Sequence, residues 1–108
     1  MDEAKLEALL EEAITHCYDD EEEFWGLFCA LQMRLSFPLQ ASVGGEAVEV
    51  VGVDEPSSGL EQGVMVHIQT GGQEKIVALT SLEVVDPDPA SGEWLAVYRH
   101  WLGKVGRG

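Results

Sequence analysis

Residues 37–54 read FPLQASVGGEAVEVVGVD, and the spacing of apolar residues changes there from a helical to a strand period. Pro38 ends the helical pattern before it, because proline lacks the N–H that a helix interior needs. Apolar residues then alternate with others, which is typical of strands. Gly44-Gly45 favours a tight turn between strands at residues 39–43 and 46–53. The segment therefore predicts a β-hairpin.

The chain after this hairpin continues the strand pattern. A second glycine pair, Gly71-Gly72, favours another tight turn, and further strands are predicted at residues 64–69, 75–79 and 82–85. Residues 54–63 contain proline, serine and glycine and are predicted to form an exposed loop. Short strands joined by tight turns hide their edges by curling and closing. We therefore expect a small SH3-like antiparallel barrel.

Helical patterns flank the strands on both sides. In residues 1–23 apolar side chains recur at three- and four-residue steps, and a second helix is predicted at residues 21–35 with Asp19 or Asp20 as its N-cap. A last helix is predicted at residues 91–102. The expected fold class is α+β and mainly β, with one or two helices before the barrel and a C-terminal helix closing it. We expect a single domain over residues 1–108, made of an acidic helical segment (1–36), the barrel (37–86) and the C-terminal helix (90–103).

The charge of the chain restricts its partners. Six Lys and Arg residues against 20 Asp and Glu residues give a formal net charge of −14. Such a chain is poorly suited to nucleic acid or anionic membranes, which attract basic residues, but it can attract a cation or a basic protein. The N-terminal residues lack the pattern of a signal peptide, and two cysteines are too few for a disulfide scaffold. We therefore expect a cytoplasmic protein with reduced cysteines.

The order of the landmarks resembles that of a known family. The landmarks are FPLQA at residues 37–41, VGVD at 51–54, and WLAVYRHWL at 94–102. This pattern resembles the small acidic calcium-binding proteins of cyanobacteria, the CcbP-like family, whose members act in calcium signalling. The resemblance implies Ca²⁺ as the ligand. The family carries an acidic residue where this sequence has Gln40, which implies a weaker or absent calcium site at that position.

Calcium requires six to eight oxygen ligands, and three acidic groups could supply them. An EF-hand is excluded, because the run that starts at Asp86-x-Asp88 has alanine at its fifth position and valine at its twelfth. The three groups also have ordinary structural explanations, namely a solvated helix start, a polar turn and a helix cap. The first group is Asp19, Asp20, Glu21, Glu22 and Glu23, the second is Asp54 and Glu55, and the third is Asp86, Asp88 and Glu93.

The loop carboxylates rank above the helical run as predicted ligands. The N–H groups at a helix N-terminus carry about half a positive charge and oppose a cation. Loop carbonyls have no such opposition and complete a calcium shell. In a small closed barrel, the loops after residues 53 and 85 can lie at the same end. The predicted ligands are Asp54, Glu55, Asp86 and Asp88, with Glu93 as an additional one, followed by Asp19, Asp20, Glu22 and Glu23.

Other chemistries find less support in the sequence. His16, Cys17 and Cys29 lack the paired spacing of a structural zinc site, and both cysteines are predicted to pack in the core. His67 and His100 are predicted to have surface or capping roles. The chain contains neither a G-x-S-x-G motif nor a phosphate loop, so we expect no enzyme. The predicted function is a calcium buffer or sensor; the alternative is an acidic module that docks on a basic protein, with calcium incidental.

Overall fold

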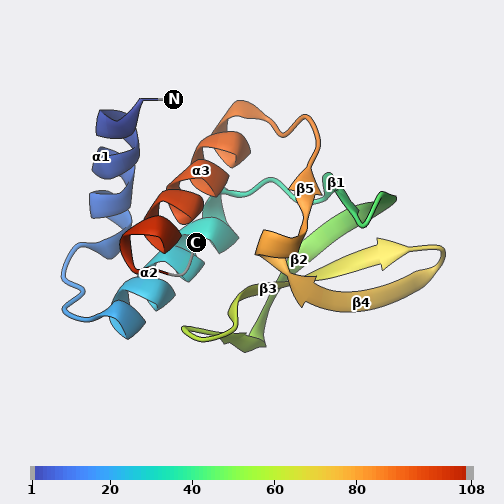
Figure 1. The fold of residues 1–108 in the computed structure, drawn as a ribbon, viewed down its shortest axis with the longest axis horizontal. Coiled ribbons are helices and arrows are strands. Elements are labelled where there is room, and N and C mark those ends of the chain that lie inside the picture. Colours follow the sequence, from blue (N-terminus) through green and yellow to red (C-terminus); the bar gives the residue numbers. More distant parts are fainter. Residues whose placement is uncertain (1, 107–108) are drawn as a thin grey trace. The chain divides into compact units, whose positions relative to one another are not determined.

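The computed structural model describes residues 2–106 and combines three α-helices with five strands (Figure 1). None of the helices in this part of the chain is long and apolar enough to cross a membrane. The elements, in chain order, are α1 (Glu3–Ile14), α2 (Asp20–Arg34), β1 (Leu39–Val43), β2 (Glu46–Gly59), β3 (Gly63–Thr70), β4 (Gln73–Ala78), the 3₁₀ turn η1 (Leu79–Ser81), β5 (Glu83–Val84) and α3 (Pro89–Lys104).

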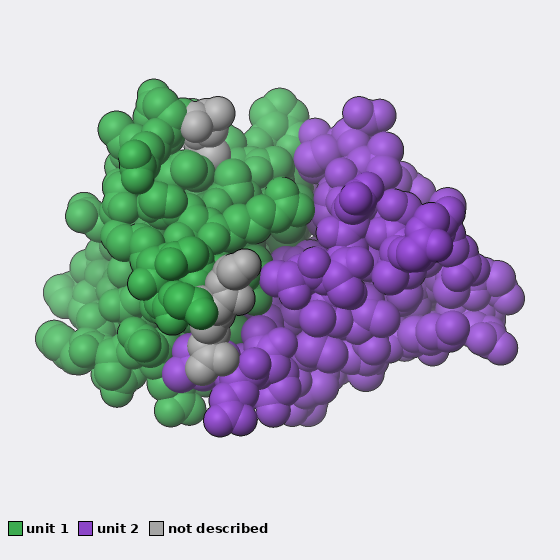
Figure 2. Space-filling view, viewed as in Figure 1, with its two compact units in different colours: residues 1–35, 88–108 green, residues 36–87 purple. Residues whose placement is uncertain are grey.

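The elements form two compact units, coloured separately in Figure 2. We call residues 1–35 with 88–108 the helical unit, and residues 36–87 the sheet unit. The predicted α+β class, with helices on both sides of the strands and a C-terminal helix, is confirmed. The expectation of a mainly β protein is wrong, because the α-helices hold 12, 15 and 16 residues and the strands only 5, 14, 8, 6 and 2.

Each helix of the helical unit begins at an aspartate. Asp2 Oδ1 accepts from Lys5 N at 2.8 Å, Asp19 Oδ1 from Glu22 N at 2.8 Å, and Asp88 Oδ2 from Ser91 N at 3.2 Å. These side chains satisfy backbone donors that have no partner within the helix. Helix α3 starts at Pro89, two residues before the predicted start, because proline is compatible with the first helical turn.

Aromatic residues dominate the core of the helical unit. Phe24 and Trp101 lie with ring centroids 6.2 Å apart and are almost fully buried. Leu27 and Phe28 are buried on the same stripe of α2, one helical turn from Leu31. Helices α1, α2 and α3 all contact one another. Trp94 and Trp101 are buried in the core, whereas Trp25 is only partly buried.

The sheet unit is a single antiparallel sheet with the strand order β4-β3-β2-β1-β5. One face carries the apolar core: Leu39, Ala41, Val48, Val50, Val64, Val66 and Ile68. The predicted closed SH3-like barrel is not confirmed, because β4 and β5 remain the two edges of an open sheet. Closure depends on strand twist and curvature, which short alternating segments do not specify on their own.

Strand β2 is longer than predicted. The predicted loop begins at Asp54, but β2 continues to Gly59 and only then turns into β3. Side chains hold this continuation, since Ser58 Oγ donates to Asp54 O at 2.6 Å and accepts from Met65 N at 2.8 Å. The register shifts between Asp54 and Gly59, which marks an irregular, bulged strand. Hydrogen bonds of the Ser58 side chain therefore take the place of regular backbone hydrogen bonds between β2 and β3 here.

Candidate functional site

The acidic run at the start of α2 divides into structural and exposed residues. Asp19 caps the helix, and Glu23 Oε1 accepts from the buried Trp101 Nε1 at 3.0 Å. Asp20, Glu21 and Glu22 are exposed on the first turn. Two of the five carboxylates are therefore already occupied by hydrogen bonds within the helical unit, and three face water.

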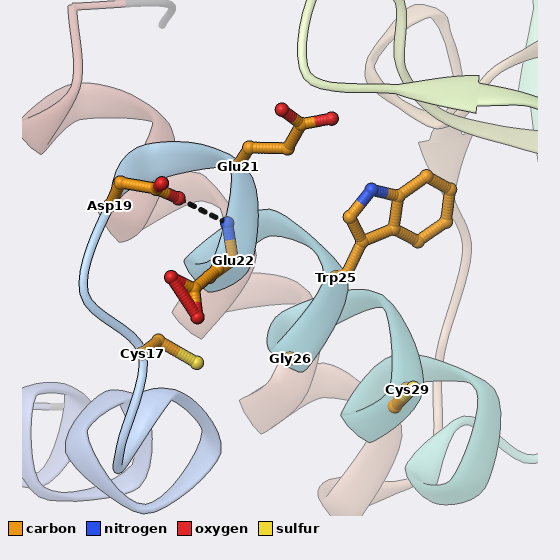
Figure 3. Close-up of a pocket in the computed structure, with 7 residues that line it drawn as sticks. All are labelled: Cys17, Asp19, Glu21, Glu22, Trp25, Gly26 and Cys29. Atoms are coloured by element: carbon orange, nitrogen blue, oxygen red, sulfur yellow. Dashed lines mark hydrogen bonds between the residues drawn. The ribbon is translucent and has the colours of Figure 1, made fainter.

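A cavity of about 500 Å³ lies beside this run (Figure 3). It is lined by Cys17, Asp19, Glu21, Glu22, Trp25, Gly26 and Cys29. Figure 3 shows the Asp19 and Glu22 side chains on the first turn of α2, above Cys17 on the segment that joins α1 to α2. The cavity thus combines an acidic end with thiol and indole groups.

The two cysteines differ from the prediction and from each other. Both are free thiols, but Cys29 is exposed and Cys17 is only partly buried, so the predicted core role is wrong for Cys29. The buried stripe of α2 runs through Phe28, and the next residue along a helix points about 100° away from it. Desolvation raises the pKa of the Cys17 thiol, and the negative charges of Glu22, Glu23 and Asp19 raise it further.

In the sheet unit, Asp54 is held by a hydrogen-bond network. Its Oδ2 accepts from the backbone N–H and the hydroxyl of Ser57, and its Oδ1 lies 2.7 Å from His67 Nε2. The Ser57 hydroxyl is the main cause that lowers the pKa of Asp54; desolvation opposes the shift, and His67 assists it. His67 Nδ1 in turn lies 3.3 Å from Glu74 Oε1, within ion-pair distance but without hydrogen-bond alignment.

The role of His67 was missed from the sequence, and strand register could have revealed it. His67 pairs with Gly52 on β2 and with Ile76 on β4. Asp54 and Glu74 are each two residues from these partners, so both are diagonal neighbours of His67 on one face. His100 was missed in the same way: its Nε2 lies 2.8 Å from Glu7 Oε1, a contact between helices that no sequence spacing indicates.

The remaining predicted ligands differ in how they are engaged. Glu55 and Asp86 are exposed, and Asp86 adopts a left-handed backbone conformation with φ of 45°. Asp88 caps α3, and Glu93 Oε2 lies 2.6 Å from Lys5 Nζ. Within residues 2–106, no three or more His, Cys, Asp or Glu side chains gather in an arrangement that could hold a metal ion. Within the described residues, the predicted acids thus form no preformed metal cage.

The comparisons with known proteins address the ligand. A family model described as calcium binding, that of the CcbP proteins, matches residues 7–102. The chain belongs to the CcbP family. The resemblance noted in the sequence is thereby confirmed, and so is Ca²⁺ as the predicted ligand at the level of the family.

Two solved structures share the fold of this chain. The crystal structure of Anabaena CcbP matches with a TM-score of 0.81 and 22% identity, over 94% of this chain and 92% of the other. A calcium binding protein in its calcium-binding form matches with a TM-score of 0.79 and 23% identity, over 95% and 93% of the two chains. No curated protein matches the sequence.

The donor chemistry of this CcbP-family chain fits calcium. Its exposed carboxylates are hard oxygen donors, and Ca²⁺ tolerates irregular shells completed by carbonyls and water. A ready-made cage of carboxylates is absent from the described residues, as the spacing of the acids shows.

Proposed function

We propose that this protein binds Ca²⁺ through surface carboxylates outside any EF-hand, and that it buffers or senses the free ion without catalysing a reaction. The observation that carries the proposal is its membership in the calcium-binding CcbP family. Its charge supports it, because 14 excess negative charges concentrate cations near the surface. The two free thiols support a reducing, cytoplasmic location.

The carboxylates of the irregular C-terminal part of β2 and of the loop after β5 are the preferred ligands in this proposal. Glu55 and Asp86 are exposed, so a cation can reach them without breaking an ion pair. Asp54 is ionised at neutral pH, because hydrogen bonds lower its pKa. Its carboxylate accepts from Ser57 N, and the backbone carbonyls of the neighbouring residues could add oxygen ligands. Asp88 and Glu93 follow as additional ligands. Asp88 caps α3 and Glu93 pairs with Lys5, so an ion bound by either residue competes with that contact.

The helical run ranks second. Asp19 and Glu23 are engaged with Glu22 N and Trp101 Nε1, and the helix dipole opposes a cation at this end. Asp20 and Glu22 are exposed and could bind an ion outward from the helix. Glu23 accepts a hydrogen bond from Trp101. An ion bound to the Glu23 carboxylate would compete with this hydrogen bond. The tryptophan fluorescence would then change on binding.

Calorimetric titration of the chelator-treated protein tests the proposal. We expect saturable Ca²⁺ binding with a Kd between micromolar and millimolar, and much weaker Mg²⁺ binding, because Mg²⁺ demands strict octahedral geometry and gives up water reluctantly. Equal, weak heats for both ions would mean only a diffuse ion atmosphere. That result would favour the alternative, in which the acidic helical segment docks on a basic protein and calcium is incidental.

A further inference from the structure

A second cavity adjoins the first along α2. It has a volume of about 220 Å³ and shares Gly26 and Cys29 with the larger cavity of about 500 Å³. At Gly26, α1 and α2 approach closely, since a Cβ there would lie 2.7 Å from Ala13 O. We call these two adjoining cavities the α2 groove. The calcium proposal makes no use of its apolar part.

Apolar side chains at helical spacing line the α2 groove. Trp25, Cys29 and Met33 follow one another at four-residue intervals, so they lie on one side of α2 over about 12 Å. Met33 has 79% of its surface exposed, and Cys29 is exposed as well. An exposed methionine on the same side of a helix as a partly covered tryptophan resembles the adaptable surfaces that receive apolar side chains from a partner.

The rim of the α2 groove is acidic. Glu12, Asp19, Glu21 and Glu22 line it, and Arg34 is its single base. The Arg34 guanidinium lies 3.6 Å from Glu12 Oε1 and 5.9 Å from the centroid of the Trp94 ring. Three carboxylates, Asp19, Glu21 and Glu22, therefore carry their charge at the rim with no basic side chain bound to them in the described part of the chain.

We propose that the α2 groove binds a basic amphipathic helix of a partner protein. The apolar stripe spans about two helical turns, which matches the contact that one face of a docked helix makes. The net negative rim selects Lys and Arg at the edges of that face and disfavours acidic partners and nucleic acid. The occupant is therefore defined by an apolar stripe flanked by positive charge. This inference is independent of where calcium binds.

A designed peptide provides the probe. The peptide is an 18-residue amphipathic helix of Leu and Lys, with a scrambled peptide of the same composition as the control, both titrated in calcium-free buffer at physiological salt. We expect the amphipathic peptide to bind at least tenfold more tightly than the scrambled one. Amide shifts in a labelled protein should concentrate on α2 and the segment before it.

Matched substitutions locate the site. Met33→Gln should weaken peptide binding at least tenfold, whereas Ile76→Gln, at an exposed apolar residue of the sheet unit, should leave it unchanged. E21K/E22K should weaken binding strongly, and E61K/E83K, with the same change of charge at exposed sheet positions, should weaken it only slightly. Melting temperatures of the free variants confirm that each still folds.

Three results would overturn the proposal. Equal affinity for the scrambled peptide would show attraction by net charge alone. Equal loss in the Met33 and Ile76 variants would place binding elsewhere. Sedimentation that shows the protein alone as a dimer, and Met33→Gln as a monomer, would make a second copy the occupant of the groove.

Discussion

The helical unit and the sheet unit carry the same formal charge but neutralise it differently. The helical unit has twelve acidic and five basic residues and the sheet unit has eight and one, so each has a formal charge of −7. In the helical unit, Lys5, Arg34 and Lys104 each form an ion pair with a glutamate. Among the described residues of the sheet unit, only His67 lies within ion-pair distance of carboxylates, namely those of Asp54 and Glu74.

This difference separates carboxylates that hold the fold from carboxylates that are available to an ion. Helix caps and ion pairs engage many acids of the helical unit, so a cation at those acids competes with an existing contact, whereas Asp20, Glu21 and Glu22 stay exposed. Among the described residues, the exposed acids of the sheet unit lack Lys or Arg partners. Under the proposed function, a divalent ion would relieve the repulsion among them, so we expect the two units to differ in calcium affinity despite their equal net charge.

The largest expected effect tests whether the two units unfold together, as the predicted single domain requires. Leu27→Ala in the helical unit and Ile68→Ala in the sheet unit each empty a buried site and should cost about 2–5 kcal/mol of unfolding free energy. All three tryptophans lie in the helical unit. We expect Ile68→Ala to lower the midpoint of the tryptophan fluorescence transition as Leu27→Ala does. An unchanged midpoint in Ile68→Ala would mean that the units unfold independently.

Calcium itself should produce the next largest effect. At a hundredfold excess over Kd, a single site on the native state adds about 2.7 kcal/mol of stability, which raises the melting temperature by about 10 °C. Hydrogen exchange should slow more at residues 54–59 and 83–86 than at residues 19–23. Sodium chloride at matched ionic strength is the control. A salt shift as large as the calcium shift would argue against any specific site.

Paired neutralisations compare the two units directly. Asp54→Asn with Asp86→Asn should weaken calcium binding at least tenfold, about 1.4 kcal/mol, because both carboxylates are proposed ligands. Glu21→Gln with Glu22→Gln removes the same charge from the helical unit and should change the affinity less. Calorimetric titration gives both values. If the Glu21/Glu22 variant loses more calcium affinity, the site lies at the start of α2 and the assignment to Asp54 and Asp86 is wrong.

The smallest expected effect concerns acid stability and salt. Lys104 and His100 lower the pKa of Glu7, and Ser57 and His67 lower that of Asp54, so both carboxylates stabilise the fold above their unfolded pKa. This stability is lost as the pH falls below about 4 through the lowered folded values. High salt should shrink the effect of Glu7→Gln, whose partner is the exposed Lys104, more than that of Asp54→Asn. Melting temperatures between pH 2 and 7, at low and high salt, measure both.

Local sequence signals determined most of the elements. Asp19 before an apolar stripe, Pro38 after it and the Gly44-Gly45 turn act over a few residues, so their helix and hairpin are readable without the fold. The order of the landmarks at residues 37–41, 51–54 and 94–102 indicated the family. The three acidic groups are equally plain in the sequence, and which of them bind calcium stays a prediction.

The tertiary structure decided what depends on residues distant in sequence. The extension of β2 past Asp54 needs Ser58 to reach Met65, and the exposure of Cys29 depends on which stripe of α2 is buried. The open edges of the sheet follow from twist and pairing over all five strands. The contacts of His67 and Glu23 arise for the same reason. Packing of the whole core brings their partners within hydrogen-bond distance. Because many distant contacts contribute to this packing, no local spacing in the sequence encodes it.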